Sequence, residues 1–381
     1  MGRRRSRSKK ANRSTLFSRL VTAVWISVGC GGLALWAGAD LPVVGPLVQC
    51  VLPGESRSQE REPAAEQEPT DQLMDAGEGG GRDAGGSSSV TPASARAEPN
   101  ANSREAGDAA SGTITIASFN IQVFGESKLS KPWVVEILAR IVRRFDVTAI
   151  QEIRCKEDYV IPEFVDAVNA DGSAYNYVVG PRLGRTISKE QYAFVYDTER
   201  IQVDMTSSGT IQDPKDYLHR DPFVTRFRTR TPNPSQSFTF WLVNVHTDPD
   251  EVATEVRALA DVFLVMQQAR ANEDDVILLG DFNANSQQFG LLGRVPGIMW
   301  VVRDTTTNTR RRKTYDNILF DRVRTAEYTG RWGVYEFENI HQLTREQALA
   351  VSDHLPVWAE FDSREAPAGN AALLPPAHMT R

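Results

Sequence analysis

The chain has 381 residues, enough for two or three domains, and a formal net charge of −6. This acidic balance does not exclude nucleic acid as a substrate, because the field at the binding cleft matters more than the total charge. The only cysteines are Cys30, Cys50 and Cys155, and one of them falls in the predicted globular region. An internal disulfide in that region is therefore excluded, and the cysteines do not indicate a redox compartment.

The N-terminus is a basic segment followed by an apolar one. Residues 1–19 begin with fourteen residues that carry seven Lys or Arg and no acid, and residues 20–39 contain no charged side chain. A helix of about 20 apolar residues spans the ~30 Å hydrocarbon core, and basic residues before it stay in the cytoplasm. Residues 1–19 are therefore predicted to be cytoplasmic. Residues 20–39 are predicted to form a transmembrane helix or signal anchor, which places the remaining chain in the periplasm or outside the cell.

Three other interpretations of residues 20–39 stay open. A cleaved signal peptide would release a secreted form, but it usually has a shorter apolar core and a small-residue cleavage site. Lipidation would use Cys30, although apolar sequence continues beyond that residue. A buried or interfacial helix is the third alternative.

The next part of the chain has the composition of a linker. Residues 54–112 are rich in Glu, Ala, Ser, Gly and Pro, with almost no aromatic residues. Such a segment cannot bury enough apolar surface to offset its ordering entropy, so we expect a disordered linker. The globular domain is predicted to span residues 113–362, a length that suits one large α/β domain. Residues 363–381, rich in Ala and Pro, are predicted to form a flexible tail.

Strand-like and helix-like patterns alternate within residues 113–362. Runs of β-branched and aromatic residues predict strands, and apolar residues at helical spacing predict helices. The predicted strands are residues 113–120, 147–151, 192–196, 223–228, 237–246, 276–279, 315–320 and 356–361. The predicted helices are residues 133–144, 162–169 and 251–271. Many strands with few helices favour sheets that pack together and are covered by helices, an α/β sandwich.

Polar side chains stand at the ends of these predicted strands. Taken singly, each is typical of a turn, a surface acid or a satisfied core histidine. Together they indicate one site, because ligands favour strand ends in α/β folds and buried polar groups need partners. The residues are Asn120, Glu152, His246, Asp281, Asn283, Asp316, Asp353 and His354.

These residue types fit the hydrolysis of a phosphodiester. A divalent cation such as Mg²⁺ or Ca²⁺ neutralises the anionic substrate and prefers oxygen ligands. Such oxygens are offered by Asn120, Glu152, Asp281, Asn283 and Asp353. The two histidines can act as base and acid near neutral pH. No Cys or His cluster has zinc-ligand spacing, and no Ser or Cys stands in a nucleophile elbow.

Eight sequence segments resemble the DNase I family, in the same order and with similar spacing. They are SFNIQVFG, IQEIR, YVVGPRLGR, KEQYAFVY, VNVHTDP, LLGDFNAN, TYDNIL and VSDHLPVWAEF. The abasic-site endonucleases and inositol phosphatases share the superfamily scaffold, but their local motifs fit less well. The resemblance covers residues 113–362 and implies a DNase I-like α/β sandwich of two packed, mostly antiparallel β-sheets flanked by helices. It also implies a monomeric endodeoxyribonuclease that uses Mg²⁺, with Ca²⁺ or Mn²⁺ as alternatives.

The resemblance implies a set of metal ligands. Glu152 resembles the principal metal-binding carboxylate, helped by Asn120 and Asp353. Asp281 and Asn283 resemble the pair that contacts the scissile phosphate or a second metal ion.

It also implies two catalytic pairs. His246 resembles one catalytic histidine, paired with Glu190, and His354 resembles the other, paired with Asp316. Together they would activate water and protonate the leaving oxygen, in an order that the sequence leaves open.

The implied DNA contacts are partly retained. Arg220 matches a phosphate-binding arginine, and Arg154 and Arg185 match positions that approach the DNA backbone or minor groove. Ser188 stands where DNase I has a tyrosine, and Gln122 where it has an arginine. Both departures are expected to weaken duplex binding, because stacking and phosphate contacts are lost.

Two points bear on the substrate. The basic run at residues 310–313 is either a solvated loop or a phosphate-contacting loop that restores affinity. The altered DNA contacts and the apolar N-terminal segment allow an alternative function, hydrolysis of a phospholipid or inositol phosphate head group on the same scaffold. A non-enzymatic binding module is a third hypothesis, and the complete catalytic set argues against it.

Overall fold

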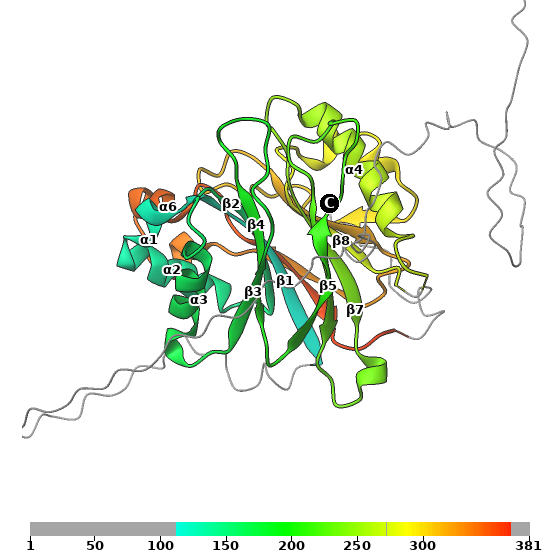
Figure 1. Ribbon diagram of the computed structural model, residues 1–381, viewed down its shortest axis with the longest axis horizontal. Coiled ribbons are helices and arrows are strands. Elements are labelled where there is room, and N and C mark those ends of the chain that lie inside the picture. The colour runs from blue at the N-terminus through cyan, green and yellow to red at the C-terminus, as the bar shows by residue number, and fades with distance from the viewer. Residues whose placement is uncertain (1–111, 272, 367–381) are drawn as a thin grey trace, which may run out of the picture. The chain divides into compact units, whose positions relative to one another are not determined.

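The structure is a computed structural model that describes residues 112–271 and 273–366 (Figure 1). Residues 1–19, residues 20–39, all but Gly112 of the predicted linker, and residues 367–381 of the predicted tail lie outside these ranges. The expectations for those segments stay predictions. Within the described ranges, no helix has both the length and the apolar character needed to cross a membrane.

The first sheet has six strands, in the order β11-β12-β1-β2-β4-β3. Its strands are β1 (Thr113–Phe124), β2 (Val147–Ile153), β3 (Tyr175–Val179), β4 (Gln191–Asp197), β11 (Tyr328–Val334) and β12 (Val357–Asp362). β1 and β2 are parallel, and the other neighbours in this sheet are antiparallel.

The second sheet also has six strands, in the order β5-β6-β7-β8-β10-β9. Its strands are β5 (Ile201–Thr210), β6 (Phe223–Thr229), β7 (Thr239–His246), β8 (Val276–Asp281), β9 (Ile298–Trp300) and β10 (Asp316–Asp321). Only β7 and β8 are parallel here. The prediction of two mostly antiparallel sheets is therefore confirmed, with one parallel pair in the middle of each.

The main apolar core lies between the two sheets. Phe194 of β4 stacks on Phe223 of β6 with ring centroids 5.4 Å apart, and Phe238 lies 4.7 Å from Phe240 and 6.0 Å from Phe361 of β12. All five rings are almost completely buried. Burial of aromatic side chains on facing sheets provides the main driving force that holds the sheets together.

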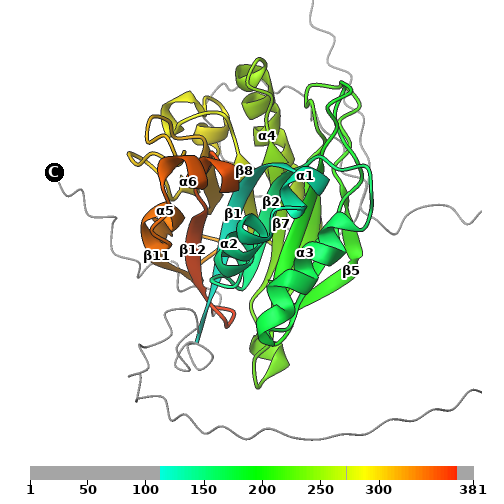
Figure 2. The same ribbon diagram turned by 90° about the vertical axis from the view of Figure 1, so that its left-hand side faces the viewer.

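Helices cover the outer face of each sheet (Figures 1 and 2). The three longest helices of the described ranges are α2 (Pro132–Val142), α3 (Val160–Val168) and α4 (Val252–Met266). α2 and α3 pack against the first sheet, and α4 packs against the second. The predicted helices are confirmed. However, α4 ends at Met266 rather than residue 271, because the buried apolar positions of its pattern end there.

All eight predicted strands are present, and the four strands that sequence patterns missed are the four edge strands, β3, β5, β9 and β11. Edge strands have a neighbour on one side only and expose more of their length, so they lack a strong apolar pattern. Three short helices were also not predicted, α1 (Glu126–Leu129), α5 (Phe337–Ile340) and α6 (Arg345–Val351).

The chain directly after β12 is joined to the domain by backbone hydrogen bonds. Ser363 N donates to Gly112 O at 2.7 Å, Phe238 N donates to Ser363 O at 3.1 Å, and Glu365 N donates to Gln236 O at 2.9 Å. Residues 363–366 fall within the predicted tail, and their hydrogen bonds reach the residues just before β1, β7 and β11.

One glycine allows the two parallel central strands to approach each other closely. Gly280 of β8 has φ +152° and pairs with Val245 of β7, and a Cβ atom at this position would lie 1.9 Å from Val245 O. Only glycine fits such a contact. The next register pair along the same strands is His246 with Asp281, so this close approach positions two of the predicted site residues.

Substitution Gly280→Ala is expected to lower the free energy of unfolding by at least about 3 kcal/mol, because the new methyl group collides with backbone. Urea denaturation followed by circular dichroism measures the change. The matched control is Gly125→Ala, since Gly125 has an extended φ of −174° and its nearest neighbour would lie 3.6 Å from the new Cβ. Equal stability of the two variants would contradict the close approach.

Candidate active site

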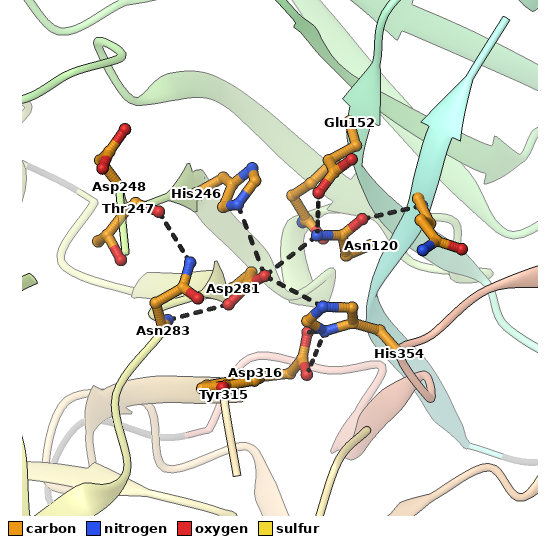
Figure 3. A network of polar contacts seen from close by, with 12 residues as sticks. Asn120, Glu152, His246, Thr247, Asp248, Asp281, Asn283, Tyr315, Asp316 and His354 are labelled. Atoms are coloured by element: carbon orange, nitrogen blue, oxygen red, sulfur yellow. Dashed lines mark hydrogen bonds and ion pairs between the residues drawn. The ribbon is translucent and has the colours of Figure 1, made fainter. Parts of the chain in front are cut away.

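Most of the predicted site residues come together at strand ends of the two sheets. Figure 3 shows seven of them side by side: Asn120, Glu152, His246, Asp281, Asn283, Asp316 and His354. Asn120 lies near the end of β1, Glu152 near the end of β2, and Asp281 at the end of β8. Register explains part of the arrangement, because Asp281 pairs with His246 of β7 on one side and with Asp316 of β10 on the other. Residues separated by up to 234 positions in the sequence are thereby brought together.

Asp281 is the central residue of the site. Its side chain is buried, and its Oδ2 accepts a hydrogen bond from Asn120 Nδ2 at 3.0 Å. The same oxygen lies 3.6 Å from His246 Nε2 and 3.5 Å from His354 Nε2. Oδ1 accepts a hydrogen bond from Asn283 N at 2.9 Å. Burial opposes ionisation of this carboxyl, but the two histidines and the donors outweigh it and lower its pKa.

His246 belongs to the first histidine–carboxylate pair. Its Nδ1 lies 2.7 Å from Glu190 Oε1, which leaves Nε2 directed toward Asp281. Burial disfavours the charged imidazole, but the carboxylates of Glu190 and Asp281 dominate and raise the pKa of His246. Glu190 is fully buried, and Arg220 Nε at 3.1 Å and Arg154 Nε at 3.5 Å help to keep it ionised.

His354 belongs to the second pair. Its Nδ1 lies 2.9 Å from Asp316 Oδ2, and Thr307 Oγ1 donates to that same carboxylate oxygen at 2.6 Å. Burial opposes protonation, but Asp316 and Asp281 raise the pKa of His354 to about 10. Both pairs therefore use Nδ1 to hold a carboxylate and direct Nε2 to Asp281. A carboxylate at Nδ1 fixes the ring orientation and tautomer for proton transfer at Nε2.

The side chains of Asn120 and Glu152 complete the polar cluster. Asn120 Nδ2 donates to Glu152 Oε1 at 3.1 Å as well as to Asp281, and Val123 N donates to Glu152 Oε2 at 2.9 Å. Gln122, Val123 and Glu152 have positive φ angles of 45°, 48° and 62°. A positive φ is rare for residues other than glycine and especially for β-branched valine. Strained backbone of this kind concentrates at functional sites, where the surrounding structure holds it in place.

The donor atoms of the site fit a hard cation. Carboxylate oxygens prevail, and Asn120 Nδ2 donates to the carboxylates of Glu152 and Asp281 while its Oδ1 accepts from Gln122 N. Three of the four predicted metal ligands are thus joined by hydrogen bonds. The fourth, Asp353, is 39% exposed, and its carboxylate lies 3.9 Å from His354 Nε2. Oxygen-rich sites of this type bind Mg²⁺ and Ca²⁺.

A second grouping of atoms in the same cluster also has metal-ligand spacing. One atom each of Asp281, Asp316 and His354 lies within 4.8 Å of the others. Because His354 Nδ1 is already hydrogen-bonded to Asp316, we interpret this group mainly as a proton-holding arrangement beside Glu152 and Asn120.

Lys128 is a buried residue of the site that the sequence analysis missed. It is 8% exposed, and its Nζ donates to three carbonyl oxygens, those of Ile121, Gln122 and Val351, at 2.8, 2.6 and 2.8 Å. Burial lowers its pKa to about 8, although the charges of Asp353 and Glu152 oppose this change. The lysine ties the strained, irregular part of β1 around Gln122 to the segment before His354, and it places a positive charge near two acids. Nothing in the surrounding sequence, ESKLSK, distinguishes it from a surface lysine.

Two further unpredicted residues join the sheets behind the site. Gln151 of β2 donates through Nε2 to Asn244 Oδ1 of β7 at 2.7 Å, and Asn244 Nδ2 donates to Ile150 O at 3.1 Å. Both side chains are completely buried. A buried polar contact of this kind restricts the relative position of two packed elements, because misalignment would leave these buried donors unpaired.

The three predicted DNA-contacting arginines occupy different environments. Arg154 contacts Glu152 at 3.2 Å and the Ser188 hydroxyl at 3.1 Å, and Arg220 contacts the backbone oxygen of His246 at 3.2 Å. These two lie at the site. Arg185 pairs instead with Asp216 and Glu251 in the surrounding loops, and the structure records no contact between its side chain and the described polar cluster.

The basic run at residues 310–313 lies on a turn attached to the site. Arg311 pairs with two glutamates, at 2.7 Å from Glu336 and 2.5 Å from Glu338, while the other three basic residues of the run are exposed. Asn308 Oδ1 accepts hydrogen bonds from the backbone of this turn, and Asn308 itself forms a β-bridge with His354. The turn is thus held beside the second histidine.

This fold and site define a class of protein, and comparison with known proteins agrees. The model of the Endonuclease/Exonuclease/phosphatase family matches residues 117–354. The chain therefore belongs to the Endonuclease/Exonuclease/phosphatase family, and the predictions of a DNase I-like member and of a phosphodiester hydrolase are confirmed.

Several named deoxyribonucleases are similar to the chain. Deoxyribonuclease-1 of Bos taurus is 32% identical over 260 residues, which cover 64% of this chain and 91% of the bovine protein. Deoxyribonuclease-1-like 1 of Homo sapiens is 35% identical over 266 residues, which cover 66% of this chain and 85% of the human protein. A solved structure of humanized D. rerio TDP2 is 16% identical, covers 66% of this chain and 99% of its own, and aligns with a TM-score of 0.46.

The pKa of His354 leads to a pH-dependent stability that can be measured without metal. Because its folded pKa of about 10 exceeds its ordinary value of 6.5, the native state binds the proton more tightly. This contribution is fully present below pH 6.5 and is lost as the pH rises toward 10. The measurement is made in EDTA at about pH 6 and about pH 9. Between these pH values, the free energy of unfolding is expected to fall in the wild type by roughly 1–4 kcal/mol more than in Asp316→Asn, which lacks the charge that raises the pKa of His354.

Urea denaturation at the two pH values measures this difference, and NMR of the His354 ring gives its titration directly. A wild-type His354 signal that titrates at its ordinary pKa would contradict the proposed pairing with Asp316.

Proposed function

We propose that this protein is a metal-dependent endodeoxyribonuclease that hydrolyses DNA by histidine-assisted attack of water. The observation that carries the proposal is the convergence of two histidine–carboxylate pairs on one oxygen, with His246 Nε2 and His354 Nε2 at 3.6 and 3.5 Å from Asp281 Oδ2. An ordinary salt-bridge network has no need for two imidazoles oriented in the same way around a buried acid. The names of the two deoxyribonucleases described above support DNA as the substrate.

The two pairs would supply one base and one acid. In each pair the carboxylate accepts the Nδ1–H of the ring, so that Nε2 is left to exchange a proton with water or with the leaving oxygen. Because both rings are held by buried carboxylates, each can carry a positive charge while an anionic phosphate is bound. Asp281 stays ionised between them and stabilises whichever ring is protonated.

A divalent cation would be held by Glu152 with Asn120, and Asp281 and Asp353 are the nearby acids that complete the oxygen-rich site. When bound, it supplies positive charge that neutralises the phosphodiester and makes attack by water easier. Mg²⁺ is our first choice, with Ca²⁺ or Mn²⁺ as alternatives. Arg154 and Arg220, which lie at the same edge, provide further positive charge toward a phosphate.

Substitutions His246→Ala and His354→Ala are each expected to lower the rate of plasmid nicking by about 10²–10⁴-fold, since each removes a proton-transfer group. The measurement uses supercoiled plasmid with Mg²⁺, with Mg²⁺ plus Ca²⁺, and with EDTA, and EDTA is expected to abolish nicking. His341→Ala is the matched control, because His341 follows α5 and has no contact with the described polar cluster. Wild-type nicking rates in both His246→Ala and His354→Ala would contradict the assignment of these histidines as proton-transfer groups.

The same assay separates the proposal from its alternative. If the folded protein leaves plasmid intact under every metal condition but releases head groups from sphingomyelin or phosphoinositide, the scaffold serves a lipid substrate. Intact plasmid would then be explained by Ser188 and Gln122, which stand where DNase I has its tyrosine and arginine. Inactivity toward all three substrates would favour a binding module.

The exposed part of the basic turn is expected to contact the DNA backbone. Arg312→Ala is predicted to weaken duplex binding, and the slope of log affinity against log salt is predicted to fall by ~0.9, the value for one lost phosphate contact. Fluorescence anisotropy with labelled duplex at several salt concentrations measures both. Arg322→Ala is the control, since Arg322 follows β10 at the opposite end of that strand and removes the same charge. Equal effects of the two variants would show that the turn makes no specific contact.

A further inference from the structure

A second group of carboxylates lies at the opposite end of the sheets from the candidate active site. Asp275 directly precedes β8, Glu327 directly precedes β11, and Glu365 follows β12. One carboxylate oxygen of each residue lies within 4.8 Å of the others. β8 runs from this cluster to Asp281, so the two sites are separated by the length of a six-residue strand, about 20 Å.

Strand register places all three residues at this end. Tyr328, the residue after Glu327, pairs with Phe361 near the end of β12, and Asp362 N donates to Glu327 O at 2.7 Å. Asp275 O in turn accepts a hydrogen bond from Trp241 N of β7 at 2.8 Å. The cluster therefore joins the second sheet, through β8, to the first sheet, through β11 and β12.

Two of these carboxylates are buried without enough hydrogen-bond donors. Asp275 is 2% exposed and Glu327 is 4% exposed, and neither Asp275 Oδ1 nor Glu327 Oε2 has a hydrogen-bond partner of normal geometry in the described structure. The Thr325 hydroxyl acts to lower the pKa of Asp275, but burial outweighs it. The other oxygen of Glu327 accepts a hydrogen bond from Ala366 N at 2.7 Å, and Glu365 Oε2 accepts one from Thr239 N at 3.3 Å. Unpaired buried carboxylate oxygens are costly, so each such atom calls for a missing partner.

The nearby basic side chains do not fill this role. Arg226 pairs with Glu273 at 2.8 Å, and Arg324 pairs with Asp274 at 3.3 Å. Across residues 112–271 and 273–366, no ion pair joins a Lys, Arg or His side chain to any of the three clustered carboxylates. The compensating charge must come either from protons on the carboxyl groups or from a bound cation.

We propose that Asp275, Glu327 and Glu365 form a second divalent-cation site, of the type that binds Ca²⁺, which fastens the two sheets together. All the offered ligands are carboxylate oxygens, which Ca²⁺ accepts in flexible geometry together with water. Water and the ion can reach the cluster because Glu365 is exposed. With no sulfur or imidazole in the set, zinc is disfavoured.

Without a cation, the three acids repel one another. Burial, followed by the charges of Glu327 and Glu365, raises the pKa of Asp275 to about 10, and burial with the charge of Glu327 raises that of Glu365 to about 7. The same geometry therefore allows a competing state, in which protons are held by the cluster. The two states respond oppositely to Ca²⁺ and to pH, so they can be separated by experiment.

The test is thermal unfolding of the purified full chain in EDTA and in a Ca²⁺ series, with Mg²⁺ as a second series. Glu327→Gln and Glu365→Gln remove ligands of the proposed site, and Glu152→Gln removes a ligand of the candidate active site as the matched control. At about a hundredfold excess of Ca²⁺ over its Kd, the wild type and Glu152→Gln are expected to gain roughly 5–10 °C in Tm. Both variants of the proposed site are expected to lose most of this gain.

In EDTA, without Ca²⁺, the Tm of Glu327→Gln is expected to equal or exceed that of the wild type. The reason is that the substitution removes one of the charges that repel one another. Calorimetric titration with Ca²⁺ is expected to show one site fewer in Glu365→Gln, a substitution at an exposed position outside the apolar core. Three results would overturn the proposal. The first is a wild-type Tm that does not change with Ca²⁺. The second is a Ca²⁺-dependent rise in Tm that is lost in Glu152→Gln but kept in both variants of the proposed site. The third is a wild-type Tm that rises on acidification and does not rise with Ca²⁺.

Discussion

The ionised carboxylate of Asp281 is buried at the end of β8, and a charge in that position is tolerated only when donors surround it. Those donors come from both sheets. Asn120 reaches it from β1 of the first sheet, His246 from β7 of the second, and His354 from the segment before β12. Register between β7 and β8, and the packing of one sheet on the other, must both be correct for this residue to stay charged. The architecture and the chemistry of the site therefore depend on the same contacts.

Around this carboxylate, positive and negative groups alternate. Each histidine lies between Asp281 and its own acid, and Glu190 is in turn held by Arg154 and Arg220. Such a network keeps both imidazole rings oriented. It also lets each ring hold a proton, because the positive charge of the ring is balanced by the neighbouring carboxylates. Lys128 adds a cation beside the strained, irregular part of β1, where it satisfies three carbonyl oxygens at once. The strained positive φ angles of that part of β1 are stabilised by these surrounding bonds.

The two ends of the sandwich differ in how their charges are balanced. At the end that contains the candidate active site, acids are matched by histidines, arginines and a lysine. At the other end, Asp275, Glu327 and Glu365 have no such partners among the described residues. Between them lies an aromatic core that excludes water and holds the sheets at a fixed separation. A cation at the unbalanced end would oppose the opening of the sheets and so support the geometry at the other end.

The sequence by itself determined the interior of the fold and the identity of the site. The central strands carry continuous apolar runs because they are buried on both faces, and their polar ends revealed His246, Asp281 and the other site residues. Exposed edge strands such as β5 and β11 carry no such pattern, so only the tertiary structure located them. It also decided which acid faces which histidine, that Lys128 is buried, and that Asp275 meets Glu327 and Glu365. Contacts between residues far apart in sequence depend on strand register and sheet packing, which no local pattern encodes.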